Sequence, residues 1–376
     1  MTKTARNTAA AAEDSFRKHY AAIWGSDRWE SSLYPALART TRYTVVPNRY
    51  APSEEFWKAI DTAQIPREEL ERLELPDVGD ATYNAQSGPL CYAHKTNDDC
   101  HFPPPVPASS GLLTHWNLDA ASALVASLLN AQPGERILDL CAAPGGKSVC
   151  ISQSLFPALY ADNAIATASS SGLLRSNEAE PRRQKRLLGN IHSYVPRAAN
   201  AQCLRVDGTS SIISGLVVPG GYDKILVDAP CSSERHIIHA HLKAKASGNA
   251  APEMTNWRPG SSKRLAQTQL ALLMTALRAV KVGGHVLYAT CSLEPTENDG
   301  VLEKMLAQVE KDRKKGTVKW NVQLGFTDGE KKAQLEEQLG NWAERTKHGW
   351  IVLPDHPSGG RWGPLFFGFI TKSANE

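Results

Sequence analysis

The sequence predicts an α/β fold in which a mostly parallel sheet has helices on both faces, with a smaller N-terminal accessory region. From about residue 111 onward, short apolar runs alternate with amphipathic segments of helical length. The stretch HFPPPVPASSG, residues 101–111, is a stiff proline-rich connector that marks a boundary. The 376 residues, 41% of them hydrophobic, suffice for one large domain and a smaller one.

The chain before the connector is heterogeneous. Residues 54–63 and 67–73 predict two helices, after which Pro, Asn, Asp and Gly indicate irregular structure. Residues 1–12 contain Lys3 and Arg6 but no acid, a composition that faintly resembles an organelle transit peptide. We therefore expect a disordered tail or weak transit peptide over residues 1–15, an accessory region over 16–110 and the main domain over 111–376.

The elements of the main domain follow one another in a regular order. Residues 118–130 predict a helix, ERILDL a strand, and residues 146–156 a second helix. A strand near 173–176, a basic helix over 181–194 and the strands CLRVDG and DKILVDAP come next. A long helix over 261–280 is closed by GG before the strand HVLYATC. Residues 158–172 and 243–264 predict long loops, and the basic residues of the second favour contact with a polyanion.

Charge and cysteine content narrow the class of protein. The net charge is only +3, but residues 182–281 hold 15 basic and 5 acidic residues, which predicts a polyanionic partner or else a solvated basic face. Seven cysteines without close pairing argue against a disulfide framework and for a reducing compartment. No apolar run approaches the ~18 residues that a membrane helix needs. The group Cys91, His94, Cys100 and His101 lacks a recognised zinc spacing, so we predict no metal site.

Five chemically active side chains follow predicted strands. Asp139, Asp207, Asp228, Cys231 and Cys291 each come at or just after a strand's carboxyl end. In a parallel sheet, ligands bind at that edge. We therefore expect these side chains to converge on one site.

Two of the strand ends suggest a nucleoside-like ligand. The turn LDLCAAPGGKS has neither the phosphate-loop nor the dinucleotide glycine spacing, and a tight structural turn explains it as well as a ligand loop does. Glu178 could hold ribose hydroxyls, and Asp207 could accept from an adenine amino group. Taken singly, each acid is equally compatible with a helix cap or a turn.

The cysteines suggest covalent chemistry. Cys291 precedes SLEPTEN, a predicted helix start whose dipole would lower the pKa of the thiol. Asp228 in DAPC suits the amino edge of a pyrimidine. Carbon 5 of cytosine is a poor nucleophile until a thiolate adds to carbon 6, and a second thiol can then promote release. Two thiols and one carboxylate at a shared edge match these requirements.

The motifs LDLCAAPGGK, SNEAEPRR, RVDG, LVDAPCS and YATCS resemble, in order, those of the Sun-domain (Fmu-type) RNA cytosine-5 methyltransferases, which use S-adenosylmethionine. The resemblance runs from about residue 111 to the end. It implies a Rossmann-like methyltransferase fold and methylation of cytosine in RNA through a covalent cysteine–cytosine intermediate. Within the family, the chain looks most similar to the mitochondrial ribosomal-RNA member. This implies rRNA as substrate, with tRNA open, and a mitochondrial location, with nucleus and cytoplasm open.

The resemblance also assigns residues. It implies that Cys291 attacks, that Cys231 assists release, that Asp228 contacts cytosine and that Lys147 orders the site. For the cofactor it points to Cys141, Ala142, Ala143, Pro144, Gly145, Gly146, Lys147, Glu178, Arg183, Asp207, Gly208 and Asp228.

RNA is thus the expected partner, with its target cytosine unpaired or flipped out because stacking hides carbon 6. We expect a monomer without a membrane segment, and a protein partner could help to deliver the RNA. Three alternatives stay open: an inactive RNA-binding or ribosome-assembly factor with the same fold, a nicotinamide-dependent oxidoreductase, and methylation of DNA.

Overall fold

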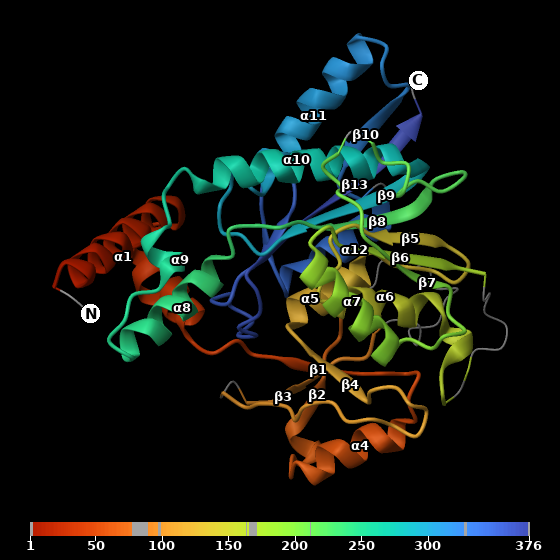
Figure 1. Ribbon diagram of the computed structural model, residues 1–376, viewed down its shortest axis with the longest axis horizontal. Helices are drawn as coiled ribbons and strands as arrows, with labels where there is room; N and C mark the ends of the chain where they lie inside the picture. Colours follow the sequence, from red (N-terminus) through yellow and green to blue (C-terminus); the bar gives the residue numbers. More distant parts are fainter. Residues whose placement is uncertain are drawn as a thin grey trace.

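The computed structural model describes residues 3–76, 89–96, 99–162, 164, 171–210, 212–326 and 329–374. Its larger sheet runs in the order β11-β12-β13-β9-β8-β5-β6-β7, with β10 paired to β13 (Figure 1). The strands are β5 (Arg136–Asp139), β6 (Leu173–Asn177), β7 (Ala201–Leu204), β8 (Tyr222–Asp228), β9 (Val280–Thr290), β10 (Trp320–Leu324), β11 (Glu344–Arg345), β12 (Trp350–Val352) and β13 (Leu365–Ala374).

The centre of this sheet is parallel, as the sequence predicts. Strands β9, β8, β5, β6 and β7 pair in parallel, whereas β13 joins β9 antiparallel and begins an antiparallel end. The chain builds β6 and β7 on one side of β5 and then returns to add β8 on the other. The order therefore reverses between β5 and β8, and ligands bind beside such a switch point in open α/β sheets.

Alternating side chains along the strands create two cores. Ile137 and Leu226 pack into one core, while their neighbours Leu138 and Ile225 pack into the other. Helices α5 (Ala120–Leu128), α6 (Gly146–Leu155) and α7 (Pro181–Tyr194) cover one face, and α10 (Ser261–Ala279) and α11 (Asp299–Lys314) cover the other (Figure 1). The predicted helices over 118–130, 146–156, 181–194 and 261–280 are confirmed to within a few residues.

The first helix differs from the prediction of a disordered tail over residues 1–15. Helix α1 (Lys3–Trp24) packs against α8 (Glu234–Ala246) and α9 (Pro252–Thr255). Phe16 and Tyr20 are fully buried, and the Glu13 carboxylate lies 3.1 Å from His241 and 3.0 Å from Lys245. The prediction of disorder is therefore wrong for residues 9–15, because the helix that contains them packs against residues that lie more than 200 positions later in the sequence.

Beyond the helical residues 26–38, which follow α1, a smaller antiparallel sheet forms part of the N-terminal region. Its order is β2 (Leu70–Arg72), β3 (Tyr92–His94), β1 (Thr44–Pro47) and β4 (His115–Leu118), and α4 (Ser53–Thr62) packs beside it. The predicted helix over 54–63 is confirmed, but residues 67–73 form a short 3₁₀ turn and β2 instead. Strand β4 comes after the proline-rich connector, so the smaller sheet draws on both predicted regions.

The structure bears differently on the two predicted loops, residues 158–172 and 243–264. Within residues 158–172, residues 163 and 165–170 lie outside the described residues. Residues 243–264 are partly helical, because α8 extends to Ala246, α9 spans Pro252–Thr255 and α10 starts at Ser261. None of the helices in the described ranges is both long and apolar enough to cross a bilayer.

Candidate active site

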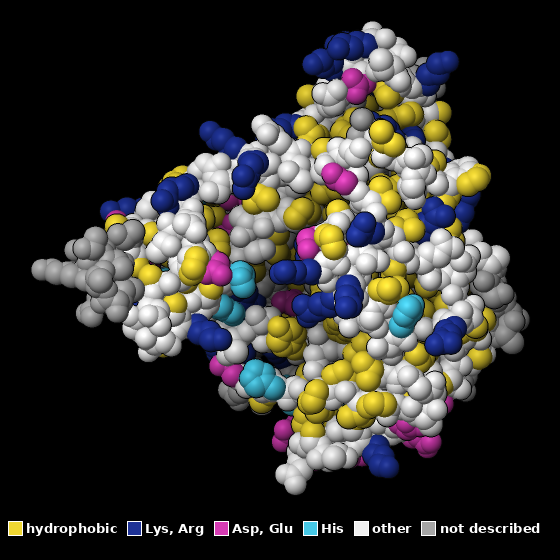
Figure 2. Space-filling model, in the orientation of Figure 1, with side chains coloured by type: hydrophobic (Ala, Val, Ile, Leu, Met, Phe, Trp, Pro, Cys, Tyr) yellow, Lys and Arg dark blue, Asp and Glu magenta, His cyan; other side chains and the backbone are white. Residues whose placement is uncertain are grey.

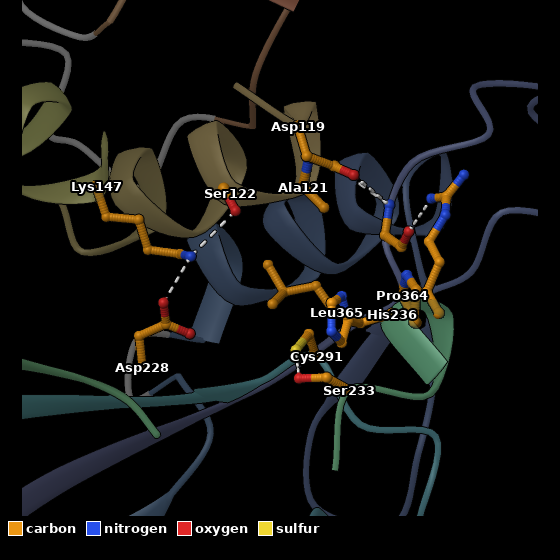
Figure 3. A pocket seen from close by; sticks show the side chains of 12 residues that line it. Asp119, Ala121, Ser122, Lys147, Asp228, Ser233, His236, Cys291, Pro364 and Leu365 are labelled. Carbon is orange, nitrogen blue, oxygen red and sulfur yellow. Dashed lines mark hydrogen bonds and ion pairs between the residues drawn. The ribbon is translucent and has the colours of Figure 1, made fainter. Parts of the chain in front are cut away.

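A cavity of about 310 Å³ opens at the carboxyl ends of β8 and β9. It is lined by Asp119, Ala121, Ser122, Lys147, Asp228, Ser233, Arg235, His236, Cys291, Gly363, Pro364 and Leu365 (Figure 3). Cys231 joins this group through its contact with Cys291. The structure therefore brings together the four residues to which the sequence assigns catalytic roles, namely Lys147, Asp228, Cys231 and Cys291.

The two thiols are in direct contact. Sγ of Cys231 lies 2.8 Å from Sγ of Cys291, and the Ser233 hydroxyl lies 3.1 Å from Cys291 Sγ. The hydrogen bond from Cys231, supported by the one from Ser233, lowers the pKa of Cys291 despite its burial. Donating that bond raises the pKa of Cys231 well above its usual value. Cys291 is consequently the thiol of the pair that ionises first.

The source of this activation differs from the sequence prediction. Helix α11 begins only at Asp299, and residues 292–298 form turns and extended segments. A helix dipole acts within about one turn of the helix end, so it does not reach Cys291. The predicted helix start at SLEPTEN is wrong, and a neighbouring thiol and hydroxyl lower the pKa instead.

Lys147 and Asp228 form a partly buried ion pair on the other side of the cavity (Figure 3). Lys147 Nζ lies 2.8 Å from Asp228 Oδ2 and donates to Ser122 Oγ at 3.0 Å. Burial alone would lower the pKa of Lys147, but the Asp228 carboxylate outweighs it and the pKa is raised. The described hydrogen bonds of Asp228 use Oδ2, which leaves Oδ1 as an acceptor towards the cavity.

One wall of the cavity comes from segments that the sequence analysis did not select. The Asp119 carboxylate caps α5 by accepting from Ala121 N at 2.8 Å, and also accepts from Gly363 N at 3.2 Å. Arg235 donates to the carbonyl of Gly363, so side chains hold both the N–H and the carbonyl group of Gly363. Pro364 follows directly and lines the cavity (Figure 3). None of the five motifs of the sequence analysis includes Asp119, Arg235 or Gly363.

Asp139, at the end of β5, lies under the turn over residues 140–147. Its Oδ2 accepts from Ser148 Oγ at 2.7 Å, while its buried Oδ1 has no hydrogen-bond partner among the described residues. Burial raises the pKa of Asp139 to about 7. An unpaired buried acceptor costs free energy, so this edge of the sheet suits a ligand that brings donors.

The two acids predicted to hold a nucleoside end neighbouring strands. Glu178, only 6% exposed, accepts from Glu180 N at 3.0 Å and forms an ion pair with Arg183 at 3.3 Å. Asp207 is exposed and accepts from Thr209 N at 2.9 Å. A carboxylate has about four acceptor positions, so both retain capacity for hydroxyl or amino donors. These acceptors fit the hydroxyl and amino donors of the nucleoside part of S-adenosylmethionine.

The glycines of this region have structural explanations. Gly145 has a φ of +119°, a backbone conformation that other residues rarely adopt. A Cβ on Gly146 would lie 2.9 Å from Leu118, and one on Gly208 would lie 2.8 Å from Leu272. Close packing thus favours glycine at these two positions, although the contacting atoms are the ends of leucine side chains.

The remaining residues of the turn lie between β5, β6 and α7. Ala142 N donates to Asn177 O at 2.8 Å, Arg183 donates to Ala143 O at 3.1 Å, and Asn190 donates to Pro144 O at 2.8 Å. Burial raises the pKa of Cys141 well above its usual value, so this thiol stays protonated. The turn is therefore held mainly through its backbone.

Comparisons with known proteins agree with this geometry. Residues 126–341 match the family model described as 16S rRNA methyltransferase RsmB/F. The chain is 30% identical over 358 residues to the mitochondrial tRNA (cytosine(34)-C(5))-methyltransferase of Danio rerio, covering 95% of this chain and 86% of the relative. It is also 30% identical over 300 residues to the 5-cytosine rRNA methyltransferase NSUN4 of Bos taurus, covering 77% of this chain and 72% of the relative.

Solved structures share the fold. The methyltransferase homolog protein from Pyrococcus horikoshii superposes with a TM-score of 0.59 at 16% identity, covering 99% of this chain and 100% of that one. NSun6 from Pyrococcus horikoshii, solved with SFG, gives a TM-score of 0.59 at 16% identity and covers 96% and 98%. At such identities the likeness concerns the fold alone.

Proposed function

Because the chain belongs to the RsmB/F (Sun-domain) family of RNA cytosine-5 methyltransferases, we propose that it methylates carbon 5 of cytosine in RNA with Cys291 as nucleophile. The contact between Cys231 and Cys291 supports this assignment most strongly. Cys291 lines the cavity that also contains the ion pair of Lys147 and Asp228, and its pKa is lowered whereas that of Cys231 is raised. The inactive-factor alternative does not account for this thiol pair.

The order of events follows from the protonation states. The Cys291 thiolate adds to carbon 6 of the base as N3 gains a proton, which makes carbon 5 nucleophilic. Oδ1 of Asp228 can accept from the amino group of the base while Lys147 holds Oδ2. Once carbon 5 carries the methyl group, a general base removes the remaining proton on carbon 5, the electrons of that bond form the double bond to carbon 6 and expel Cys291 as a thiolate, and N3 loses the proton it had gained. We assign this release to Cys231, whose sulfur is already next to that of Cys291.

Residues of the other half of the same sheet edge would hold the cofactor. When bound, S-adenosylmethionine supplies an electrophilic methyl group. In our proposal Glu178 holds its ribose hydroxyls, Asp207 with Gly208 borders its adenine, Arg183 fixes Glu178, and the turn over residues 141–147 surrounds it. The unpaired Oδ1 of Asp139 beneath that turn supports this placement.

A basic face of α7 is suited to hold the RNA backbone. Arg182, Lys185 and Arg186 are exposed, and no described residue forms an ion pair with their side chains. Basic residues near a helix N-terminus oppose the helix dipole, so an external anion is their natural counter-charge. Figure 2 shows Lys and Arg side chains gathered beside a hollow where the start of α7 lies in Figure 1. This is the part of the basic stretch over 182–281 that we assign to RNA.

The RNA class and the compartment are finer proposals. The names of the relatives favour rRNA, with tRNA as the alternative, and a mitochondrial location. Fractionation of cells that express a tagged chain tests the location, and gel filtration with and without RNA tests the expectation of a monomer that a partner could assist.

Methyl transfer to total RNA from a labelled donor tests the activity itself. We expect label in RNA with the wild-type chain and none with Cys291→Ala. Sequencing of bisulfite-treated RNA from cells with and without the protein then identifies the modified cytosine. Label that enters RNA equally well with Cys291→Ala would contradict the proposal.

A further inference from the structure

A fully buried carboxylate lies between the two loops that carry the cysteines. Glu234, the first residue of α8, is 0% exposed. It accepts from the backbone N–H of Leu293 at 2.8 Å, beyond Cys291, and from the hydroxyl of Ser232, next to Cys231. Its third donor is the phenol of Tyr20 in α1, at 2.8 Å. One side chain therefore joins both cysteine loops to the N-terminal helix.

The loops have little regular structure to hold them otherwise. Residues 229–233 and 291–294 belong to no helix or strand. Ser232 Oγ lies 2.8 Å from Ser292 Oγ, so the residues that follow the two cysteines are in contact with each other. A second buried carboxylate, Glu297, accepts from Ser232 N at 3.1 Å and from Gln269 at 2.8 Å. The relative position of the two sulfurs depends on these polar contacts.

Burying such a network of polar groups costs solvation free energy. Burial raises the pKa of Glu234 to about 7 and that of Tyr20 well above its usual value. Apolar side chains of similar volume would fill the same space at lower cost in solvation, and buried polar groups are justified where they specify one geometry. The geometry that this network specifies is the contact between the thiols.

We propose that Tyr20 and Glu234 are positioning residues that hold Cys231 against Cys291, which makes helix α1 part of the active-site scaffold. The inference rests on the proposed function only where it gives the contact between the thiols a role in catalysis. The positioning itself can be measured without RNA. Neither residue reaches the cavity lining, so both act through the loops.

Tyr20→Phe tests the inference with little disturbance of packing, because only one hydroxyl is removed. Tyr34→Phe is the matched control, since Tyr34 is a buried phenol in the same aromatic cluster around Trp29. The rate at which iodoacetamide labels Cys291, followed by mass spectrometry of its peptide across pH, reports the pKa of that thiol. We expect the midpoint in Tyr20→Phe to move upward by about one unit, because the bond from Cys231 is weakened. Tyr34→Phe should leave it in place.

The same substitution in a Cys231→Ala background separates positioning from general destabilisation. There the hydrogen bond to Cys291 is already absent, so Tyr20→Phe should cause no further shift. Glu234→Gln keeps the shape of the side chain but also removes a charge that raises the pKa of Cys291, so its two effects on the midpoint oppose each other and Tyr20→Phe carries the test. Asp228 and Lys147 also face Cys291, and they are unchanged in all of these variants.

Turnover gives the second readout. In Tyr20→Phe we expect kcat to fall roughly tenfold, the scale of one lost hydrogen bond, with an unchanged KM for S-adenosylmethionine. An unshifted labelling midpoint in Tyr20→Phe would overturn the inference. Absence of methyl transfer in the wild-type chain would refute the proposed function instead and leave the labelling result intact.

Discussion

The carboxyl edge of the large sheet has two halves that are built differently. At β6 and β7, Glu178 and Asp207 accept from backbone N–H groups two residues further along the chain. At β8 and β9, the groups around the thiols come from distant segments, such as Tyr20 in α1 and Gly363 before β13. The proposed cofactor half is therefore local in sequence, whereas the proposed reaction half depends on the whole fold. Substitutions in the two halves should consequently have separable effects.

The largest effect is expected in the reaction half. Cys291→Ala should lower methyl transfer by roughly a thousandfold or more, because the covalent step has no substitute nucleophile. Binding of S-adenosylhomocysteine, measured by thermal shift, should be unchanged. Loss of both methyl transfer and S-adenosylhomocysteine binding in this variant would mean that the two halves of the sheet edge are not separable.

The basic face of α7 should influence RNA rather than either half of the site. Replacing Arg182, Lys185 and Arg186 by Glu should weaken RNA binding at least about tenfold and reduce the slope of log K against log salt by roughly 0.7 for each lost phosphate contact on a single strand. Lys304→Glu and Lys311→Glu in α11, together with Lys315→Glu at its C-cap, form the matched control with the same change in charge. Equal losses in both variants would indicate non-specific charge attraction instead of a defined RNA path.

In the cofactor half, Glu178→Gln should raise the KM for S-adenosylmethionine about tenfold, since a charged acceptor for hydroxyls is lost. The labelling profile of Cys291 should stay the same. Glu180→Gln, which alters only the cap of α7, serves as the control. A shift in Cys291 labelling would show that the two halves communicate.

The smallest expected effect concerns stability and pH. The pKa of Glu234 is raised from 4.5 to about 7 by burial, so the folded state holds this proton more tightly than the unfolded chain does. The stabilisation is fully present below the unfolded pKa and is lost as pH rises through about 7. Between pH 5 and pH 8 this loss amounts to at most about 3 kcal/mol, a shift of a few degrees in unfolding temperature.

Glu234→Gln should flatten this pH dependence when the unfolding temperature is measured across the same range. Asp139, whose pKa is also raised to about 7, should leave a residual slope that Asp139→Asn removes. A slope that is unaffected by both substitutions would contradict the protonation states described above.

The sequence predicts the local half of the site better than the distant half. Strand ends, α7 and the strand-end acids could be read from periodicity and motif order, because each depends on neighbouring residues. The role of Tyr20 could not, since its partner Glu234 is 214 positions away. The same holds for Gly363 and for the activation of Cys291, where a helix dipole was expected but a thiol of another loop supplies the effect.

The central claim is that Cys291 attacks the base and Cys231 releases it. Intact-protein mass spectrometry after incubation of Cys231→Ala with RNA and S-adenosylmethionine tests it most directly. We predict a persistent protein–RNA adduct whose RNA is attached to the peptide that contains Cys291, and no adduct in Cys291→Ala. An adduct that persists in Cys291→Ala and is absent in Cys231→Ala would reverse the two assignments and contradict the claim.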